Sequence, residues 1–218
     1  SSEQLVFDKS TQELILCIEN GRLTIASLNQ KNGECVGIEV FQFSKTDLDD
    51  IKNFIDQVKQ QSSLMHLTGL DIIIYNRTPN AMLFPTTMAN SSSEFIETQF
   101  GYKEGEQMQS ETINDAISIT WKTDINLLLA FNETFSLIKW RSSLGLLVKS
   151  ALNQIDEHSV IQLLFGHETV ELTITKNKQL LLAKCFEFNA IEDICYHLLN
   201  GCRQLNISPS EVLVKVQG

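Results

Sequence analysis

Short apolar runs separated by turn residues open the chain. Residues 13–28, ELILCIENGRLTIASL, contain two β-type runs on either side of Asn20 and Gly21. This pair favours a hairpin because both residues accept positive φ. A second turn at residues 31–33 leads to a third run, ECVGIEVFQF. The pattern therefore predicts three consecutive strands.

A helical period follows the third run. Between residues 47 and 61 the apolar positions fall near one helical face, and Thr46 with Asp49 gives the spacing of an N-terminal cap. Those apolar positions are Leu48, Ile51, Ile55 and Val58. The continuous apolar run DIIIYN, residues 71–76, then predicts a fourth strand that is covered on both faces.

The same order returns near the other end of the chain. Strands are predicted at 160–166, 169–174 and 179–188, a helix at 191–205 and a last strand at 211–216. Asn189 and Glu192 have the capping-box spacing, and Glu192 and Asp193 fall in the first helical turn, where carboxylates are favourable, so we expect both to be capping residues. The apolar stripe of this helix comprises Ile191, Ile194, Leu198, Cys202 and Leu205.

The β-β-β-α-β order thus occurs twice, which predicts an internal duplication. A shift of 145 residues places 21–43 on 166–188 without a gap and gives six identities in 23 positions, including Phe41 with Phe186 and Phe43 with Phe188. We expect a first domain over 1–153 and a second over 154–218. Between the copies the pattern predicts helices at 91–101, 125–135 and 144–152, strands at 115–122 and 136–140, and a loop at 103–112.

Composition and charge narrow the class of protein. The content of 43% hydrophobic and 20% charged residues is that of a globular chain, and no apolar run is long enough to span a membrane. A net charge of −10 opposes a nucleic-acid partner. The five cysteines form no C-x-x-C pair and lie in apolar stretches, so we expect buried thiols in a reducing compartment, the cytoplasm.

Several short motifs carry a resemblance to a known fold. They are the proline-bearing segment MLFPTTM at 82–88, the pair Phe100-Gly101 at the end of a helix, and the F-x-F-x-x-x-E-D block formed by Phe186, Phe188, Glu192 and Asp193. With the doubled β-β-β-α-β order, the chain resembles the actin-like ATPase fold and, more closely, an uncharacterised family of bacterial proteins with that fold.

The resemblance implies an α/β protein with mixed sheets, in which two ribonuclease H-like domains flank a cleft, and it implies no known activity. The helix, strand and helix from 125 to 152 are similar to those that lead into the second domain in the pilus-assembly and cell-division ATPases of this superfamily. The resemblance also implies that the chain continues past Gly218, so that the second copy is incomplete here.

Active actin-like ATPases cradle phosphates in the first hairpin of each domain. An Asp holds Mg²⁺ through water, while Gly and Ser or Thr bring backbone N–H groups to phosphate oxygens. Neither hairpin here contains Asp-x-Gly; Glu19 is a weak substitute and Arg22 could meet an anion. The candidate binding residues are Glu19, Asn20, Gly21, Arg22, Gly166, His167, Glu168 and Thr169.

Other chemistry has little support in the sequence. There is no P-loop, dinucleotide-binding or G-x-S-x-G motif, and HETVE at 167–171 lacks the second histidine of a zinc protease. We therefore expect a non-catalytic interaction or scaffold protein with a protein partner, no catalytic residue, no metal and no cofactor. The alternative is a divergent ATPase or sugar-kinase-like protein that binds ATP and Mg²⁺ in the cleft. The sequence leaves the oligomeric state open.

Overall fold

A computed structural model describes residues 12–44, 47–65, 72–154 and 158–218. The chain divides into two compact units, Ser1–Tyr75 with Asp124–Trp140, and Asn76–Thr123 with Arg141–Gly218. Each unit therefore joins two separate stretches of sequence. The predicted boundary after residue 153 lies between the two predicted repeats and does not coincide with the division into these two compact units. It stays a prediction.

The first unit is built around a mixed sheet with the strand order β3-β2-β1-β4-β8. Asn20 and Gly21 have φ values of 39° and 74°, so the predicted hairpin between β1 and β2 is confirmed. The predicted third and fourth strands are confirmed as well. The strands are β1 (Gln12–Glu19), β2 (Arg22–Asn29), β3 (Cys35–Gln42), β4 (Ile72–Asn76) and β8 (Ile138–Ser142).

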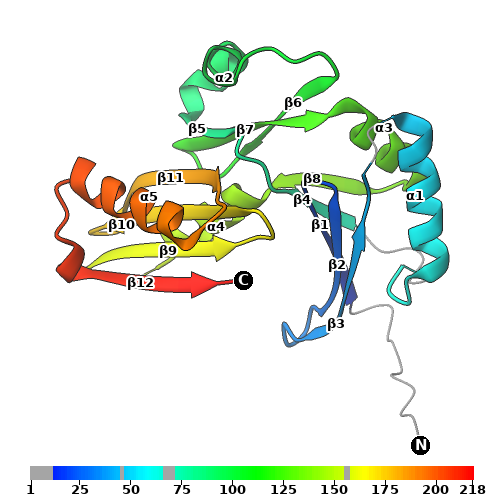
Figure 1. The fold of residues 1–218 in the computed structure, drawn as a ribbon, viewed down its shortest axis with the longest axis horizontal. Coiled ribbons are helices and arrows are strands. Elements are labelled where there is room, and N and C mark those ends of the chain that lie inside the picture. Colours follow the sequence, from blue (N-terminus) through cyan, green and yellow to red (C-terminus); the bar gives the residue numbers. More distant parts are fainter. Residues whose placement is uncertain (1–11, 45–46, 66–71, 155–157) are drawn as a thin grey trace, which may run out of the picture. The chain divides into compact units, whose positions relative to one another are not determined.

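Two helices of the first unit, α1 (Leu48–Gln61) and α3 (Ile125–Thr134), pack against each other and against the sheet (Figure 1). Their apolar residues form one core with alternating residues of β1 and β2. The buried positions of α1 are Ile51, Ile55 and Val58, as the helical period predicts. The cap of α1 is Asp47, whose carboxylate accepts the N–H of Asp50 at 2.9 Å; Thr46 lies outside the described residues.

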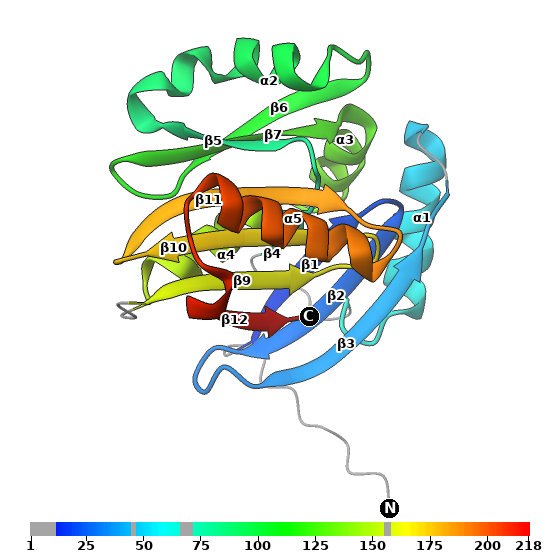
Figure 2. The same cartoon turned by 60° about the vertical axis from the view of Figure 1, so that its left-hand side comes forward.

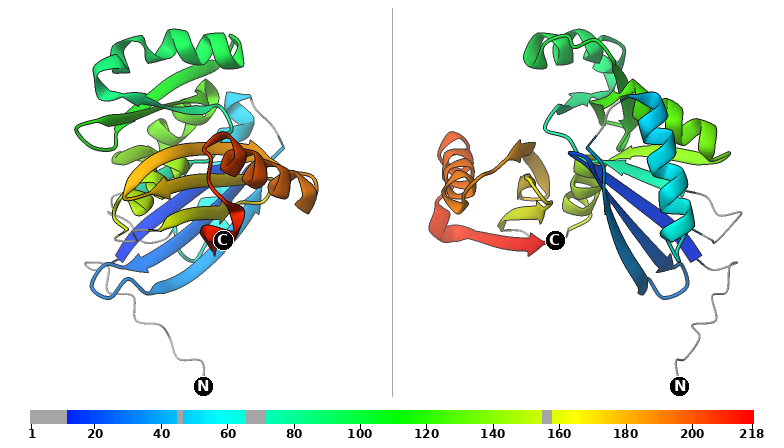
Figure 3. Two further views of the ribbon diagram at one scale, coloured as in Figure 1. Left: turned by 90° about the vertical axis from the view of Figure 1, so that its left-hand side faces the viewer. Right: turned by 45° about the vertical axis from the view of Figure 1, so that its right-hand side comes forward.

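The second unit contains a sheet with the order β11-β10-β9-β12, in which β12 runs parallel to β9 (Figure 2). Helix α5 shares a buried core with β9, β10 and β11, and α4 packs on the opposite face of this sheet (Figure 3, right). The elements are α4 (Ser143–Leu152), β9 (Ser159–Phe165), β10 (Thr169–Lys176), β11 (Gln179–Glu187), α5 (Ile191–Gln204), a short 3-10 turn η3 (Pro209–Glu211) and β12 (Val212–Gln217).

The start of α5 differs from the prediction in two respects. Asp193 caps the helix, as expected, because its carboxylate accepts the N–H groups of Asn189 and Ala190 at 2.9 and 3.0 Å. The N–H of Asn189 therefore meets Asp193 and not Glu192, the partner that the capping-box spacing predicts. Ile191 was expected on the buried stripe but is 65% exposed. The capping carboxylate thus lies in the first turn, as expected, one residue further along.

The segment between the repeats contains a further small sheet with the order β5-β7-β6. Residues 103–112 were expected to be a loop, but most of them form β6. The strand lies at the edge of its sheet, where polar side chains can face solvent, so it lacks the apolar pattern that reveals a buried strand. The elements are β5 (Ala81–Pro85), η2 (Thr86–Ser91), α2 (Ser92–Phe100), β6 (Glu106–Thr112) and β7 (Ile117–Asp124).

The cysteines are only partly buried. Cys185 and Cys202 are buried as expected, whereas Cys35 and Cys195 are exposed, which corrects the expectation of uniformly buried thiols.

Within the described part of the chain, no helix combines the length and the apolar character that crossing a bilayer requires.

The strand pairing of the two repeats agrees closely. Ile18 pairs with Leu23, and Phe165 with Val170, an offset of 147 residues between the two hairpins. In the third strands Phe41 faces Leu23 and Phe186 faces Val170, an offset of 145. The ungapped shift of 145 therefore holds for the third strand only, because the loop before it is two residues longer in the first repeat. Register shifts at Ser27/Leu28 and Ile174/Thr175 also correspond, again by 147.

Candidate functional site

The first candidate hairpin joins β1 to β2 in a tight two-residue turn. Both turn residues have positive φ, which is typical of a type I′ turn and explains the Asn-Gly sequence without a ligand. The carbonyl of Gly21 accepts the N–H of Phe43 at 2.7 Å, so the turn is also tied to the end of β3. Glu19 is 6% exposed and Arg22 is half-buried. Glu19, the candidate carboxylate, is therefore largely withdrawn from solvent.

The second candidate hairpin joins β9 to β10. Gly166 donates its N–H to the carbonyl of Thr169 at 2.8 Å, and Glu168 accepts the N–H of Phe188 at 3.1 Å. His167 and Glu168 are exposed, and Thr169 is completely buried. Neither His167 nor Glu168 has the positive φ of the first hairpin. The two hairpins share strand pairing but differ in the backbone of their turns.

The hairpin backbones do not offer the anion-binding geometry of a phosphate loop. Such a nest needs a right-handed and a left-handed residue in succession, with free N–H groups converging on the anion. The first turn has two successive residues of positive φ, the second has none, and the N–H of Gly166 is used within its own hairpin. Among the described residues, no group of three or more His, Cys, Asp or Glu side chains is arranged to hold a metal.

A buried charge network that no sequence motif predicts lies two residues beyond the second hairpin. Glu171 accepts a hydrogen bond from the hydroxyl of Ser143 at 2.7 Å, and Nε of Arg77 lies 3.7 Å from the same carboxylate. Arg77 and Glu171 are 9% and 0% exposed. Arg77 follows β4 and Ser143 begins α4, so the network fixes three distant segments rather than presenting groups to a ligand. The only signal in the sequence is a glutamate amid the apolar and threonine residues of β10.

The paired strands β9 and β10 each contribute one buried side chain without a hydrogen-bond partner among the described residues. They are Thr173 of β10, through its hydroxyl, and Gln162 of the neighbouring strand β9, through both amide atoms, and they lie opposite each other on the ladder. Both are buried, at 0% and 1% exposure. An unpaired polar atom in such a position lowers the stability of the folded protein. This face of the sheet therefore contains polar groups without hydrogen bonds, whereas the face beneath α5 is apolar.

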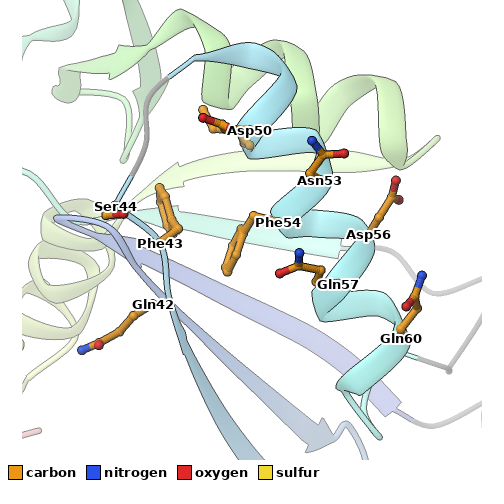
Figure 4. A pocket seen from close by; sticks show the side chains of 10 residues that line it. Gln42, Phe43, Ser44, Asp50, Asn53, Phe54, Asp56, Gln57 and Gln60 are labelled. Atoms are coloured by element: carbon orange, nitrogen blue, oxygen red, sulfur yellow. The ribbon is translucent and has the colours of Figure 1, made fainter.

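A groove of about 650 Å³ lies in the first unit between the end of β3 and one flank of α1. Phe43 and Phe54 pack against each other there, with ring centroids 4.9 Å apart. Asn53, Gln57 and Gln60 project from the flank of α1 (Figure 4). Gln42, Asp50 and Asp56 also line the groove, so its wall is rich in amides and carboxylates.

A hydrogen-bonded clamp fixes the far end of α1 to β3. Glu39 of β3 accepts bonds from the hydroxyl of Ser62 and from the N–H and hydroxyl of Ser63, the last two at 3.0 and 2.7 Å. Burial acts to raise the pKa of the Glu39 carboxyl, but the bonds from Ser62 and Ser63 outweigh it and hold this pKa below its ordinary value. The groove therefore lies between elements that are fastened to each other.

Comparison with known proteins identifies the fold. The model of a family described as "Protein of unknown function (DUF3822)" matches residues 3–218. The chain is similar to a solved protein of Bacteroides thetaiotaomicron described as having an actin-like ATPase fold and unknown function, with a TM-score of 0.82, 15% identity, and coverage of 97% of this chain and 85% of that one. A comparison with curated proteins found no match.

Two further solved structures are similar at lower scores. One is the PilM-PilN type IV pilus biogenesis complex, with a TM-score of 0.54, 9% identity, and coverage of 90% of this chain and 66% of that one. The other is the cytoplasmic domain of EpsL from Vibrio cholerae, with a TM-score of 0.52, 6% identity, and coverage of 95% and 84%. At these identities the likeness shows the fold alone, and the predicted actin-like ATPase fold is confirmed.

Proposed function

The chain belongs to the DUF3822 family, and from that premise we propose that it is an interaction or scaffold protein that carries out no nucleotide chemistry. A fold does not determine an activity, so the proposal must rest on the site. The observation that carries the proposal is that neither hairpin has the sequence or the backbone geometry of a phosphate-binding turn. Their sequences lack Asp-x-Gly, and their turns lack the backbone arrangement that surrounds a phosphate.

The burial of two candidate side chains supports the same proposal. Glu19, the one carboxylate that could hold Mg²⁺ through water at the first hairpin, is 6% exposed, and Thr169 is 0% exposed. Gly21 is explained by its turn and by its contact with Phe43. At the two hairpins the Asp-x-Gly motif is therefore missing, Gly21 serves the turn itself, and Glu19 and Thr169 are withdrawn from solvent.

The fold neighbours supply a second line of support. One is a component of a pilus biogenesis complex, and another is described as part of an inner membrane component of the type II secretion system. Both proteins work within larger assemblies, and we infer that the present chain also binds a protein partner. We place it in the cytoplasm, since its five cysteines form no C-x-x-C pair and lie in apolar stretches of the sequence, as in proteins of a reducing compartment.

Isothermal titration calorimetry with ATP and ADP in the presence of Mg²⁺ tests the proposal. We expect no saturable binding at millimolar nucleotide. Micromolar binding that is lost in Glu19→Ala or Glu168→Ala would instead establish the alternative, a divergent nucleotide-binding ATPase or sugar-kinase-like protein. Glu97→Ala, which removes a carboxylate from the exposed face of α2, is the control for the general loss of a negative charge, and circular dichroism confirms that each variant is folded.

A further inference from the structure

Strand β3 has a free edge. It is the terminal strand of its sheet, and in the part of the chain that the structure describes no strand pairs with its other side. Phe43 donates its N–H toward β2, and residues two apart on a strand point the same way. The N–H and C=O groups of Ile38, Val40 and Gln42 therefore point away from β2. Ile38 and Val40 are also 64% and 45% exposed.

The flank of α1 offers hydrogen-bonding groups beside the end of this edge. Asn53 and Gln57 lie one helical turn apart, about 6 Å along the axis. A strand repeats every two residues, or roughly 6.8 Å. Side-chain amides both donate and accept hydrogen bonds. Successive amides of α1 thus match the spacing at which an extended peptide presents its own backbone groups.

The charge of the groove indicates what such a peptide carries. Asp50 and Asp56 line it, and no Lys or Arg is among the lining residues that the structure describes. The protein as a whole has a net charge of −10. A strand added to β3 directs alternate side chains to opposite faces. Basic side chains fit the face toward α1, and β-branched apolar side chains fit the face that displays Ile38 and Val40.

The groove is held in shape without the peptide. The clamp from Glu39 to Ser62 and Ser63 fastens the end of α1 to β3, and the pair Phe43–Phe54 fastens the middle of the helix to the end of the strand. A site that is already ordered loses less conformational freedom on binding, which favours affinity.

We propose that the edge of β3 and the groove beside α1 bind an extended segment of a partner protein that alternates basic and β-branched residues and adds a strand to the sheet. This mode of recognition uses main-chain hydrogen bonds for affinity and alternate side chains for specificity. The inference rests on the proposed function, because it specifies the partner that an interaction protein of this fold would bind.

The test uses a fluorescein-labelled heptapeptide of alternating lysine and valine, Lys-Val-Lys-Val-Lys-Val-Lys, in an anisotropy titration with the full chain. A second peptide, in which two valines are replaced by proline, has the same charge but cannot complete the ladder. We expect the first peptide to bind at least about tenfold more tightly, because each proline removes a backbone N–H that could donate a hydrogen bond to β3. In an NMR titration the amide signals of Ile38, Val40 and Gln42 should shift.

Matched variants locate the site. Asp56→Lys in the groove should weaken binding about tenfold, as expected for a charge-assisted contact, whereas Glu97→Lys on the exposed face of α2 makes the same charge change elsewhere. Gln57→Ala should weaken binding, while Gln61→Ala, on the same helix but outside the groove lining, should not.

Equal binding of the two peptides, equal effects of Asp56→Lys and Glu97→Lys, or no binding of the alternating peptide would each overturn the docking site. Self-association in sedimentation that Val40→Lys abolishes would make a second copy of the chain the occupant and would overturn it too. These outcomes leave the nucleotide titration unchanged. Failure of the docking site is therefore distinguishable from failure of the proposed function.

Discussion

At the scale of single residues, Glu39 shows how one side chain fixes the geometry of the groove. Its carboxylate accepts three hydrogen bonds from Ser62 and Ser63, and it does so best when ionised. Because the folded protein holds the pKa of Glu39 below the ordinary value of 4.5, the ionised form is favoured by folding. This contribution is fully present above the unfolded pKa and is lost as pH falls through the folded pKa.

We expect Glu39→Gln to lower the melting temperature at neutral pH, and the difference from the wild type to shrink as pH falls below 4.5. Thermal denaturation followed by circular dichroism between pH 7 and pH 3 measures it. Glu97→Gln, an exposed carboxylate on α2, controls for the general effect of removing a negative charge. A difference between wild type and Glu39→Gln that is constant with pH would contradict the assignment.

At the scale of elements, the β1–β2 hairpin depends on glycine for two separate reasons. Gly21 has a φ of 74°, and a Cβ atom there would clash with the carbonyl oxygen of Phe43. Gly33, in the next loop, has a similar φ of 71° with no atom within 4 Å of the added Cβ. A comparison of alanine substitutions at Gly21 and Gly33 therefore distinguishes the energetic cost of a left-handed backbone from the cost of the close approach to Phe43.

Gly33→Ala should therefore lower the free energy of unfolding by about 1 kcal/mol, the cost of the left-handed backbone alone. Gly21→Ala should lower it by roughly 3 kcal/mol, because the contact with Phe43 must also be relieved. Urea denaturation of the two variants makes the comparison. Equal losses would mean that the turn moves freely away from β3.

At the scale of the whole molecule, the network of Arg77, Ser143 and Glu171 joins segments far apart in the sequence within the second unit. Removing one partner of a buried ion pair leaves an uncompensated charge, whereas replacing both can be nearly neutral. We expect Glu171→Met to lower the free energy of unfolding by about 3 kcal/mol, and the double variant with Arg77→Met to recover much of that loss.

An exposed pair provides the contrast for this prediction. Lys52 and Glu133 join α1 to α3 at 2.5 Å, with side chains 36% and 54% exposed. Glu133→Gln should change the free energy of unfolding by less than about 1 kcal/mol, since solvent screens the pair. Chemical denaturation of both sets measures the difference. If Glu171→Met were as mild as Glu133→Gln, the buried network would not hold the segments together.

The order of elements follows from the sequence because it depends on local periodicity. Alternation and turn residues gave the hairpin at Asn20-Gly21, and a helical stripe gave Ile51, Ile55 and Val58 as buried positions. The cap of α1 is Asp47 and not the predicted Thr46, and the capping pair of α5 uses Asp193 and not Glu192, since several neighbouring polar residues satisfy nearly the same spacing. β6 was missed because an edge strand can be polar on both faces.

The sequence by itself determined that the chain repeats a β-β-β-α-β order and that its two hairpins lack Asp-x-Gly, because strand periodicity, turn chemistry and motifs are local properties. Only the tertiary structure decided that Glu19 and Thr169 are buried, that Glu171 meets Arg77, and that the end of β3 and the flank of α1 enclose a groove. The physical reason is that burial and pairing depend on which distant segments come together, and the spacing of residues along one segment does not specify its partners.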